Sequence, residues 1–589
     1  MTEKILVAVA WPYASASIHV GNMAGADLPP DIFARYHRLK GNDVLMVSGS
    51  DSHGTPITVR AHAEGVEPRE VFQRFHAEFL ETFEKMGLTY DLFTHTDTEN
   101  HHHVARQLFL RLLENGYLFS KTQEQLYSVS EGRFLPDRYV EGTCPHCGYD
   151  GARGDQCENC GKLLNAIELI DPRTRTDGSA PEVRETTHYF LDLPKLADML
   201  IGWLDEGKEG WRPQVINFAR NMARDLQARP ITRDLAWGIP VPVEGWEGKS
   251  LYVWFEAVIG YLSAAIEWAR NQGTPEVWRE WWYHPQARTM YFIGKDNIPF
   301  HTIIWPGILA GAKRLYRDDQ DVIFNLPTDV PANEFLNMES RKVSGSRGWA
   351  VWVLDVLSRY DPDALRYYLT SVAPETRDTD FTWQGFVQRN NDELVATWGN
   401  LANRMLAFSY KRFDGRVPQP GALDEADEAI LATVEAGFET VGGLIDACKF
   451  RAALGEVMNL ARAVNRYLDN KAPWLSIKQD RTAAASSVYV TLRAIDSLKI
   501  LFTPFLPFSS QALHEMLGYE GSVFGRQYVA TFQEETRSHR ALCYDRSALT
   551  ARWEPSRLPP GQPLRKPRPL FKKLEEGVVE EELARMRGV

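Results

Sequence analysis

Two short segments of this chain carry side chains suited to phosphate chemistry, and the first lies near the N-terminus. An apolar run at residues 5–10 has the length and β-branched content of a strand and breaks at Pro12. We expect a helix to begin near residue 17, with His19 and Asn22 facing the same way from its first turn. Free N–H groups and the positive dipole end meet at such a terminus, so the turn predicts an anion site.

The second segment, Arg-Lys-Val-Ser-Gly-Ser-Arg at residues 341–347, lies far downstream. Its cations, hydroxyl groups and glycine suit the oxygen atoms of a polyphosphate. We expect Lys342, Ser344 and Ser346 to close over such a group as a mobile loop. The first segment alone is typical of a βα turn with an incidental histidine. Two segments in this order and context are far more specific than either one.

Four of the six cysteines form two Cys-x-x-Cys pairs with nine residues between them, and each pair is followed by a glycine. The set is Cys144, Cys147, Cys157 and Cys160. This spacing predicts tetrahedral Zn²⁺ bound by four thiolates, which closes the coordination shell and makes the metal structural. Disulfides are the alternative, and they fit poorly with the cytoplasmic location expected below.

Composition limits the classes of protein that this chain can belong to. The 589 residues exceed one domain, and 44% hydrophobic and 24% charged residues are ordinary for a globular protein. A net charge of −12 argues against non-specific coating of nucleic acid but allows a local basic surface for RNA. We find no signal peptide and no apolar run that could span a membrane, so we expect a soluble, cytoplasmic protein.

The order of the expected elements predicts an α/β fold. It is a Rossmann-type doubly wound parallel sheet with a zinc-knuckle insertion, followed by an all-α bundle. A second buried strand at 43–49 ends in a polar turn that contains Asp51, where ligands bind in such sheets. The expected parts are 1–118 (first half of the sheet domain), 119–232 (insertion), 233–319 (second half), 320–383 (region with the 341–347 loop), 384–535 (helical domain) and 536–589 (tail, with one exposed helix near 575–586).

Together the two phosphate segments resemble the His-Ile-Gly-His and Lys-Met-Ser-Lys-Ser signatures of class I aminoacyl-tRNA synthetases. The insertion at 119–232 is too short for the editing domain of the leucyl, isoleucyl and valyl enzymes. A four-cysteine knuckle also differs from the mixed zinc ligands of the cysteinyl enzyme. Over about residues 1–520, and more weakly into the tail, the chain resembles the methionyl-tRNA synthetase family.

The resemblance implies a pocket for the methionine side chain. The segments 254–261 and 297–305 place aromatic residues and a histidine on shared helical faces, which also suits two amphipathic core helices. Aromatic rings suit a polarisable thioether. By resemblance the pocket residues are Trp11, Tyr13, Asp51, Trp254, Ala257, Val258, Tyr261, Asn297, His301 and Trp305, with Asp51 binding the ammonium group.

The same resemblance implies sites for ATP and tRNA. The ATP residues are His19, Gly21, Asn22, Arg233, Gly294, Asp296, Lys342 and Val343, of which His19 and Asn22 act with Lys342, Ser344 and Ser346 in catalysis. The residues for the tRNA anticodon are Asn400, Arg404 and Trp474, although a Trp after a Pro is also typical of a minor core contact. The implied partners are L-methionine, ATP with Mg²⁺, and tRNA(Met). We expect a monomer, because no further barrel domain follows the bundle.

Four positions depart from the family pattern, and they leave alternatives open. Asn22 and Gly345 replace the usual second histidine and second lysine, Trp11 replaces a common leucine, and Ala396 replaces an asparagine. Trp11 permits a class I enzyme for another amino acid. Asn22 and Gly345 permit a catalytically weak tRNA-binding paralogue, against which Asp51, Asp296 and the aromatic pocket argue. A nucleotidyltransferase shares the first turn but has no reason to carry the insertion and the bundle.

Overall fold

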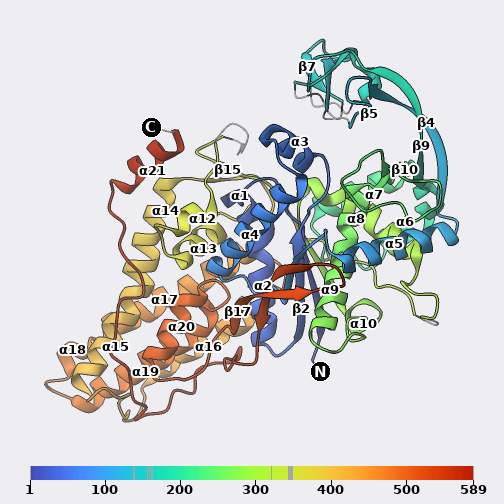
Figure 1. The fold of residues 1–589 in the computed structure, drawn as a ribbon. Helices are drawn as coiled ribbons and strands as arrows, with labels where there is room; N and C mark the ends of the chain where they lie inside the picture. The colour runs from blue at the N-terminus through green and yellow to red at the C-terminus, as the bar shows by residue number, and fades with distance from the viewer. Residues whose placement is uncertain are drawn as a thin grey trace.

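The structure is a computed structural model that describes residues 2–136, 139–154, 157, 159–160, 164–319, 322–341 and 349–587. Figure 1 shows a central sheet between helices, a small β module at the end of a long two-stranded arm, and a helical bundle that extends on the other side of the sheet. Within these residues, no helix is both long and apolar enough to cross a membrane.

The central sheet has the strand order β14-β13-β1-β2-β3-β18-β17. Its strands are β1 (Lys4–Val9), β2 (Asp43–Ser50), β3 (Leu92–His95), β13 (Arg288–Gly294), β14 (Ala332–Asn333), β17 (Arg526–Gln533) and β18 (Ser538–Asp545). The first five are parallel, and β18 joins β3 in the antiparallel sense. The chain order reverses between β1 and β13, and a crevice for ligands opens at the carboxyl ends of the strands at such a point.

Strand β1 shows why helices cover both faces of the sheet. Its side chains alternate, so that Ile5, Val7 and Val9 belong to one hydrophobic core and Leu6 and Ala8 to another. All five are fully buried. The first face is covered by α2 (Leu28–Leu39) and α4 (Pro68–Met86), and the second by α5 (Glu99–Glu114), α9 (Gly260–Asn271) and α11 (Trp305–Ala312). The expected doubly wound α/β fold is confirmed.

The insertion stands on a two-stranded antiparallel arm (Figure 1). The arm consists of β4 (Leu118–Ser128) and β9 (Glu182–Leu191), and the module at its end contains β5 (Arg133–Phe134), β6 (Val140–Thr143), β7 (Asp150–Arg153) and β8 (Ile170–Thr174). The module has its own small core, which includes Cys144 and Cys157. Its Tyr139 hydroxyl lies 3.3 Å from Thr58 Oγ1 on α3 (Thr55–Glu64), so the module also touches the sheet domain.

The C-terminal half of the chain is a helical bundle whose core is continuous with one face of the sheet. Its main helices are α15 (Asn400–Arg412), α16 (Glu425–Asp446), α17 (Phe450–Lys471), α19 (Arg481–Phe502) and α20 (Pro507–Met516). Helix α17 ends at Lys471 and is followed by its C-cap Ala472, which adopts a left-handed φ of 39°, and Pro473 then begins the short α18 (Pro473–Ser476). Proline at the first position of a helix ends the preceding one, because its nitrogen has no hydrogen to donate.

Shorter elements connect these parts. They are α1 (Val20–Asn22), α6 (Ala197–Asp205), α7 (Pro213–Ala223), α8 (Val253–Glu256), α10 (Arg279–Trp282), α12 (Val353–Leu357), α13 (Pro362–Ser371), α14 (Trp383–Arg389), α21 (Val578–Arg587), β10 (Arg229–Pro230), β11 (Thr232–Arg233), β12 (Ser250–Leu251), β15 (Leu336–Met338) and β16 (Thr379–Phe381). A π-helical turn at Met23–Asp27 joins α1 to α2, so one continuous helical run follows His19.

Two C-terminal segments differ from the expectation. Residues 526–545, expected at the end of the helical domain and in the tail, form a hairpin that extends the central sheet through β3. The unpaired backbone groups at the edge of β3 are satisfied in this way. The helix expected to be exposed is α21, and its Glu582 is only 2% exposed. Glu582 accepts hydrogen bonds from Arg359 (2.7 Å) and from the hydroxyl of Tyr360 (2.7 Å), so α21 is docked on the domain.

Candidate active site

A cavity of about 300 Å³ lies at the switch point between β1 and β13. Its walls come from the loop after β1, from the helical run after His19, and from the segments after β13 and β14. The sequence-predicted residues that line it are Trp11, His19, Gly21, Asn22, Gly294, Asp296 and Asn297. The fold therefore brings together residues that lie almost 300 positions apart in the chain.

His19 is the N-cap of the helical run. Its Nδ1 accepts a hydrogen bond from the backbone N–H of Asn22 (3.1 Å), and Asn22 Oδ1 accepts one from the N–H of His19 (3.2 Å). Because Nδ1 is an acceptor, the hydrogen of the neutral ring is on Nε2. Burial lowers the pKa of His19 to about 4, so the imidazole is neutral at pH 7. The result is a fixed, uncharged N–H donor at a helix N-terminus.

Gly21 makes room for this imidazole. A Cβ atom at position 21 would lie 2.9 Å from both Cε1 and Nδ1 of His19. Any larger residue would therefore push the ring out of its capping position. The side chain of Asn22 lines the cavity. Its Oδ1 accepts the hydrogen bond of the cap, so the Nδ2 amide group remains to donate to a ligand.

The chain that follows the second phosphate segment lies beside the first segment. Lys342, Val343, Ser344 and Ser346 fall outside the described residues, and the chain is described again from residue 349. The backbone N–H of Val20 donates to the carbonyl of Val351 (3.0 Å), and that of Val353 donates to Ile18 (2.9 Å). The polypeptide that follows the second segment thus pairs with the residues that flank His19.

Asp296 and Arg233 approach the site from different elements. Asp296 is exposed on the short turn directly after β13, and among the described residues no hydrogen bond or ion pair engages its carboxylate. It is therefore available to ribose hydroxyls. The guanidinium of Arg233 lies 3.9 Å from the ring centre of Tyr252 and donates to the carbonyl of Thr232 (2.9 Å). Arg233 lines a second cavity, of about 160 Å³, together with Tyr13 and Trp254.

The predicted amino-acid pocket is built around a buried hydrogen-bond chain. His301 Nδ1 donates to the carbonyl of Asn297 (2.9 Å), and the hydroxyl of Tyr261 donates to His301 Nε2 (2.7 Å). Burial lowers the pKa of His301 to about 4, which agrees with a neutral ring. Trp305 is fully buried beside Tyr261, and its Nε1 donates to the hydroxyl of Tyr291 (3.0 Å). Ala257 and Val258 are buried on the turn between Trp254 and Tyr261.

Trp11 is accommodated by two glycines distant in sequence. A Cβ atom at Gly49 would lie 2.2 Å from the Trp11 ring, and one at Gly260 would lie 2.6 Å from it. The ring therefore occupies space left by missing side chains on β2 and α9. Its edge meets the ring of Tyr261, with 6.5 Å between the ring centres. In the sequence, Trp11 only differs from the leucine that is common in the family which the chain resembles. The packing shows that the absence of side chains at Gly49 and Gly260 makes room for the larger ring.

The carboxylate of Asp51 is buried and has few hydrogen-bond donors around it in the part of the chain that the structure describes. It is 2% exposed, and the one hydrogen bond that it accepts from a described residue comes from the N–H of His53 (3.2 Å). Burial, and then the charge of Glu256, raise the pKa of Asp51 well above its ordinary value. Its backbone carbonyl accepts from the N–H of Ala14 (3.0 Å), so it lies directly beside Tyr13. Such a group favours a cationic ligand.

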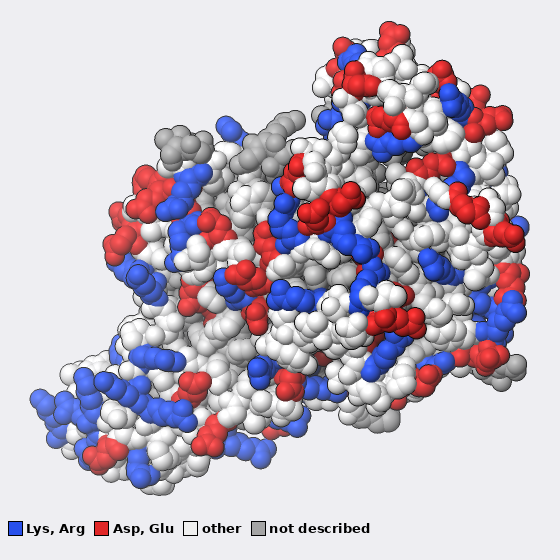
Figure 2. All heavy atoms as spheres, viewed as in Figure 1, with Lys and Arg blue, Asp and Glu red and all other residues white. Residues whose placement is uncertain are grey.

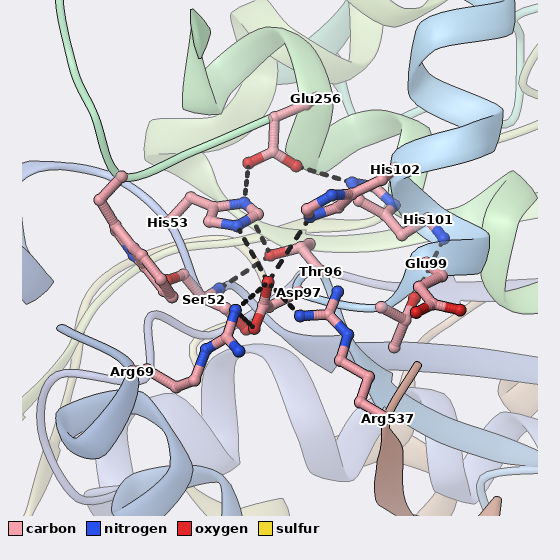
Figure 3. A network of polar contacts seen from close by, with 12 residues as sticks. Ser52, His53, Arg69, Thr96, Asp97, Glu99, His101, His102, Glu256 and Arg537 are labelled. Atoms are coloured by element: carbon pink, nitrogen blue, oxygen red, sulfur yellow. Dashed lines mark hydrogen bonds and ion pairs between the residues drawn. The ribbon is translucent and has the colours of Figure 1, made fainter. Parts of the chain in front are cut away.

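Sequence reasoning missed the polar residues that surround Asp51. Glu256, on α8, accepts hydrogen bonds from His53 Nδ1 (2.9 Å) and from His101 Nε2 (2.7 Å) (Figure 3). Burial alone would raise the pKa of Glu256, but the two imidazoles hold it below its ordinary value. The sequence offered two signals, the consecutive histidines at 101–103 and a single acid inside an apolar helical segment.

The four cysteines converge at the end of the arm, and their sulfur atoms all lie within 4.8 Å of one another. The Sγ–Sγ distances are 3.9 Å for Cys144 and Cys160 and 3.6 Å for Cys147 and Cys157. Donation from the Tyr149 backbone N–H and from Asn159 lowers the pKa of Cys147 to about 6. Thiolates at this spacing, with N–H donors to sulfur, fit a tetrahedral metal ion.

The predicted anticodon residues cluster at the far end of the bundle. Asn400 and Arg404 line an open hollow of about 390 Å³ with Ala396 and residues of α17. The guanidinium of Arg404 lies 5.0 Å from the ring centre of the half-buried Trp474. Figure 2 shows Lys and Arg side chains gathered over this end, around α15 and α18, although the chain as a whole is acidic.

A crevice at the switch point of a doubly wound sheet, with the first signature segment in its wall and the chain after the second one paired beside His19, is the arrangement of a class I aminoacyl-tRNA synthetase. The family model described as "tRNA synthetases class I (M)" matches residues 5–406, and that of the "Anticodon binding domain of methionyl tRNA ligase" matches 417–543. The chain belongs to the methionyl-tRNA synthetase family and is an aminoacyl-tRNA ligase, a methionine–tRNA ligase, as the sequence predicted.

Individual relatives agree with this assignment. The methionine–tRNA ligase of Thermomicrobium roseum is 57% identical over 100% of this chain and 99% of its own. That of Chloroflexus aggregans is 54% identical over 100% of both. The crystal structure of Mycobacterium tuberculosis methionyl-tRNA synthetase bound by methionyl-adenylate superposes with a TM-score of 0.75 at 25% identity, and covers 97% of this chain and 100% of that one.

Proposed function

We propose that the crevice performs the activation step of this ligase with the residues described above. The methionine carboxylate attacks the α-phosphorus of ATP, a P–O bond to that carboxylate forms, and the bond to the β-phosphate oxygen breaks. Pyrophosphate leaves with the Mg²⁺ that accompanies ATP. A hydroxyl of the 3′-terminal ribose of tRNA(Met) then attacks the carbonyl carbon of methionyl-adenylate, and AMP leaves. Positioning and stabilisation of phosphate charge supply the catalysis.

His19 and Asp51 have complementary roles in this proposal. The Nε2–H of His19 donates to phosphate oxygens at the N-terminus of the helical run, where the dipole also favours negative charge. The buried carboxylate of Asp51 binds the methionine ammonium group. Tyr261, His301 and Trp305 supply aromatic and imidazole contacts for the thioether. Asp296 binds the ribose, and Lys342, Ser344 and Ser346 close over pyrophosphate.

The zinc cluster and the anticodon site lie away from the reacting atoms. We assign the four-cysteine cluster to one Zn²⁺, held by Cys144, Cys147, Cys157 and Cys160, whose closed shell folds the module and takes no part in the reaction. Asn400, Arg404 and Trp474 bind the anticodon of tRNA(Met). We further propose that the protein is a cytoplasmic monomer.

One observation supports the proposal: residues predicted for ATP line one crevice at the switch point together with Trp11 and Asn297, two of the residues predicted for methionine. ATP–pyrophosphate exchange with the purified protein, Mg²⁺ and each amino acid in turn tests it. We expect exchange with methionine alone. Exchange with another amino acid would reassign the pocket, and silence with and without tRNA would favour the tRNA-binding paralogue.

His19→Ala is expected to lower the rate of exchange by about 10²- to 10³-fold, in the range seen when one preorganised donor to a transition state is removed. The methionine KM stays near the wild-type value, because the imidazole lies on the phosphate side of the crevice. Stopped-flow measurement of adenylate formation checks both numbers. An unchanged rate would remove His19 from the reaction.

Trp474→Ala is expected to raise the KM for tRNA while adenylate formation stays unchanged. Stacking of a base on an aromatic side chain contributes about 1–3 kcal/mol, so the KM rises by about 5- to 150-fold. Aminoacylation of tRNA(Met) and ATP–pyrophosphate exchange, measured on the same preparation, separate the two steps. An equal loss in both assays would contradict the assignment of this end of the bundle to tRNA.

A further inference from the structure

A buried charge network lies beneath the amino-acid pocket, and Asp97 is at its centre (Figure 3). The side chain of Asp97 is 5% exposed. Its Oδ1 lies 3.6 Å from Nε2 of His102 and 4.0 Å from Nε2 of His53. Arg69 and Arg537 approach the same carboxylate, each with a guanidinium nitrogen 3.1 Å away. Arg69 is 47% exposed and Arg537 is 24% exposed, so Arg537 is the better desolvated partner.

Arg537 comes from the turn of the C-terminal β17–β18 hairpin, and the rest of that turn is also fastened to the sheet domain. Glu534 accepts hydrogen bonds from the N–H groups of Glu99 (3.0 Å) and Asn100 (3.1 Å) at the start of α5. Glu99 in turn accepts one from the N–H of Glu535 (2.8 Å). His539 Nε2 lies 2.8 Å from Glu267 on α9. Helix α5 carries His101 and His102, so the hairpin is joined to the elements that hold the network.

His53 connects this network to Asp51. Its ring lies between Glu256, 2.9 Å from Nδ1, and Asp97, 4.0 Å from Nε2. Its backbone N–H supplies the hydrogen bond to Asp51 described above. Glu256 lies on α8, two residues after Trp254 and directly before Ala257 of the pocket. A change in the charge near Asp97 therefore affects His53. Through His53 it affects both the carboxylate of Asp51 and the segment that carries Trp254 and Ala257.

We infer that Arg537 is a positioning residue for methionine binding, and that the C-terminal hairpin is in this way a component of the amino-acid site. The positive charge of Arg537 balances the negative charge of Asp97. His53 then keeps its hydrogen bond to Glu256, and the backbone N–H of His53 stays in position to donate to Asp51. This inference rests on the proposed binding of the methionine ammonium group at Asp51. It assigns a role in the reaction to a segment that lies more than 430 residues from Asp97 in the chain.

The test is ATP–pyrophosphate exchange by the full chain, with methionine and ATP titrated separately. We expect Arg537→Gln to raise the KM for methionine by about three- to tenfold, a usual size for residues that act through others, and to leave the KM for ATP unchanged. Arg537→Lys, which keeps the charge, should restore most of the methionine affinity. If the arginine only stabilised the fold, its removal would not raise the KM for methionine while leaving the KM for ATP unchanged.

Arg546→Gln is the matched control. Arg546 follows the same hairpin and lies 3.0 Å from Asp43 at the other end of β2, away from the pocket. We expect no change in either KM for this variant. Equal effects of Arg537→Gln and Arg546→Gln, or an unchanged methionine KM in Arg537→Gln, would overturn the inference.

Asp97→Asn, alone and together with Arg537→Gln, provides a second test of the pairing. Asp97→Asn removes the charge that Arg537 balances, so the double variant should raise the methionine KM no further than the larger single change. Independent, multiplying effects would overturn the inference. Asp51→Asn in the same assay keeps the two proposals apart. If wild type responds to methionine and Asp51→Asn does not, the proposed function stands whatever the Arg537 variants do.

Discussion

Asp51→Asn is expected to lower kcat/KM for methionine in ATP–pyrophosphate exchange by about 150- to 5,000-fold, because it removes one partner of a buried ion pair, a change that costs about 3–5 kcal/mol. Asparagine has the shape of aspartate but carries no charge, so the ammonium group loses its counter-ion while the fold is kept. The KM for ATP should stay near the wild-type value. A methionine KM within twofold of wild type would remove Asp51 from the ammonium site.

The role of Asp51 can also be tested through the proton that its carboxyl group releases when methionine binds. Burial and the charge of Glu256 raise the pKa of Asp51, so in the free protein this carboxyl keeps its proton up to a higher pH than an ordinary aspartate does. Methionine binds as an ammonium ion and favours the ionised carboxylate, so binding releases this proton. Affinity therefore increases with pH until the raised pKa is passed. Calorimetry in buffers of different ionisation enthalpy should show proton release in wild type and none in Asp51→Asn.

Arg366→Ala is expected to lower the free energy of unfolding by about 3–5 kcal/mol, because it removes one of the two buried arginines that pair with Asp31 and leaves three backbone carbonyls without their donor. Arg366 and Asp31 are both fully buried, and Nη2 of Arg366 lies 2.7 Å from Asp31 Oδ2 on α2. The same guanidinium donates to the carbonyls of Met86 (3.0 Å), Pro504 (2.9 Å) and Phe505 (2.9 Å). One side chain thus links the sheet domain to the turn between α19 and α20.

Urea unfolding followed by tryptophan fluorescence checks this prediction. Lys85→Ala is the control, since Lys85 pairs with Glu81 on the surface, where both side chains are about half exposed. It should change the free energy of unfolding by less than about 1 kcal/mol. A loss below about 1 kcal/mol in Arg366→Ala would show that the domain interface does not depend on this residue.

Local sequence determined the parts of the site that lie within single elements. The break at Pro12 and the polar residues after it predicted the helix N-terminus at His19, and the cap forms there because its donors and acceptors are only three residues apart. The spacing of the four cysteines predicted their convergence for a similar reason, since each Cys-x-x-Cys pair is local and only two pairs have to meet. The helical faces of 254–261 and 297–305 follow from periodicity.

Tertiary structure alone decided which distant residues complete the site. No local pattern relates Trp11 to Gly49 and Gly260, yet the ring occupies the space beside both glycines. The residues of the hairpin that contains Arg537 read as the end of a helical domain, because strand pairing with β3 depends on an edge that the rest of the fold creates. Buried charges such as Asp97 and Glu582 are stable only where other segments of the chain supply their partners. Long-range packing determines those partners, and neither hydrophobic periodicity nor local propensity predicts it.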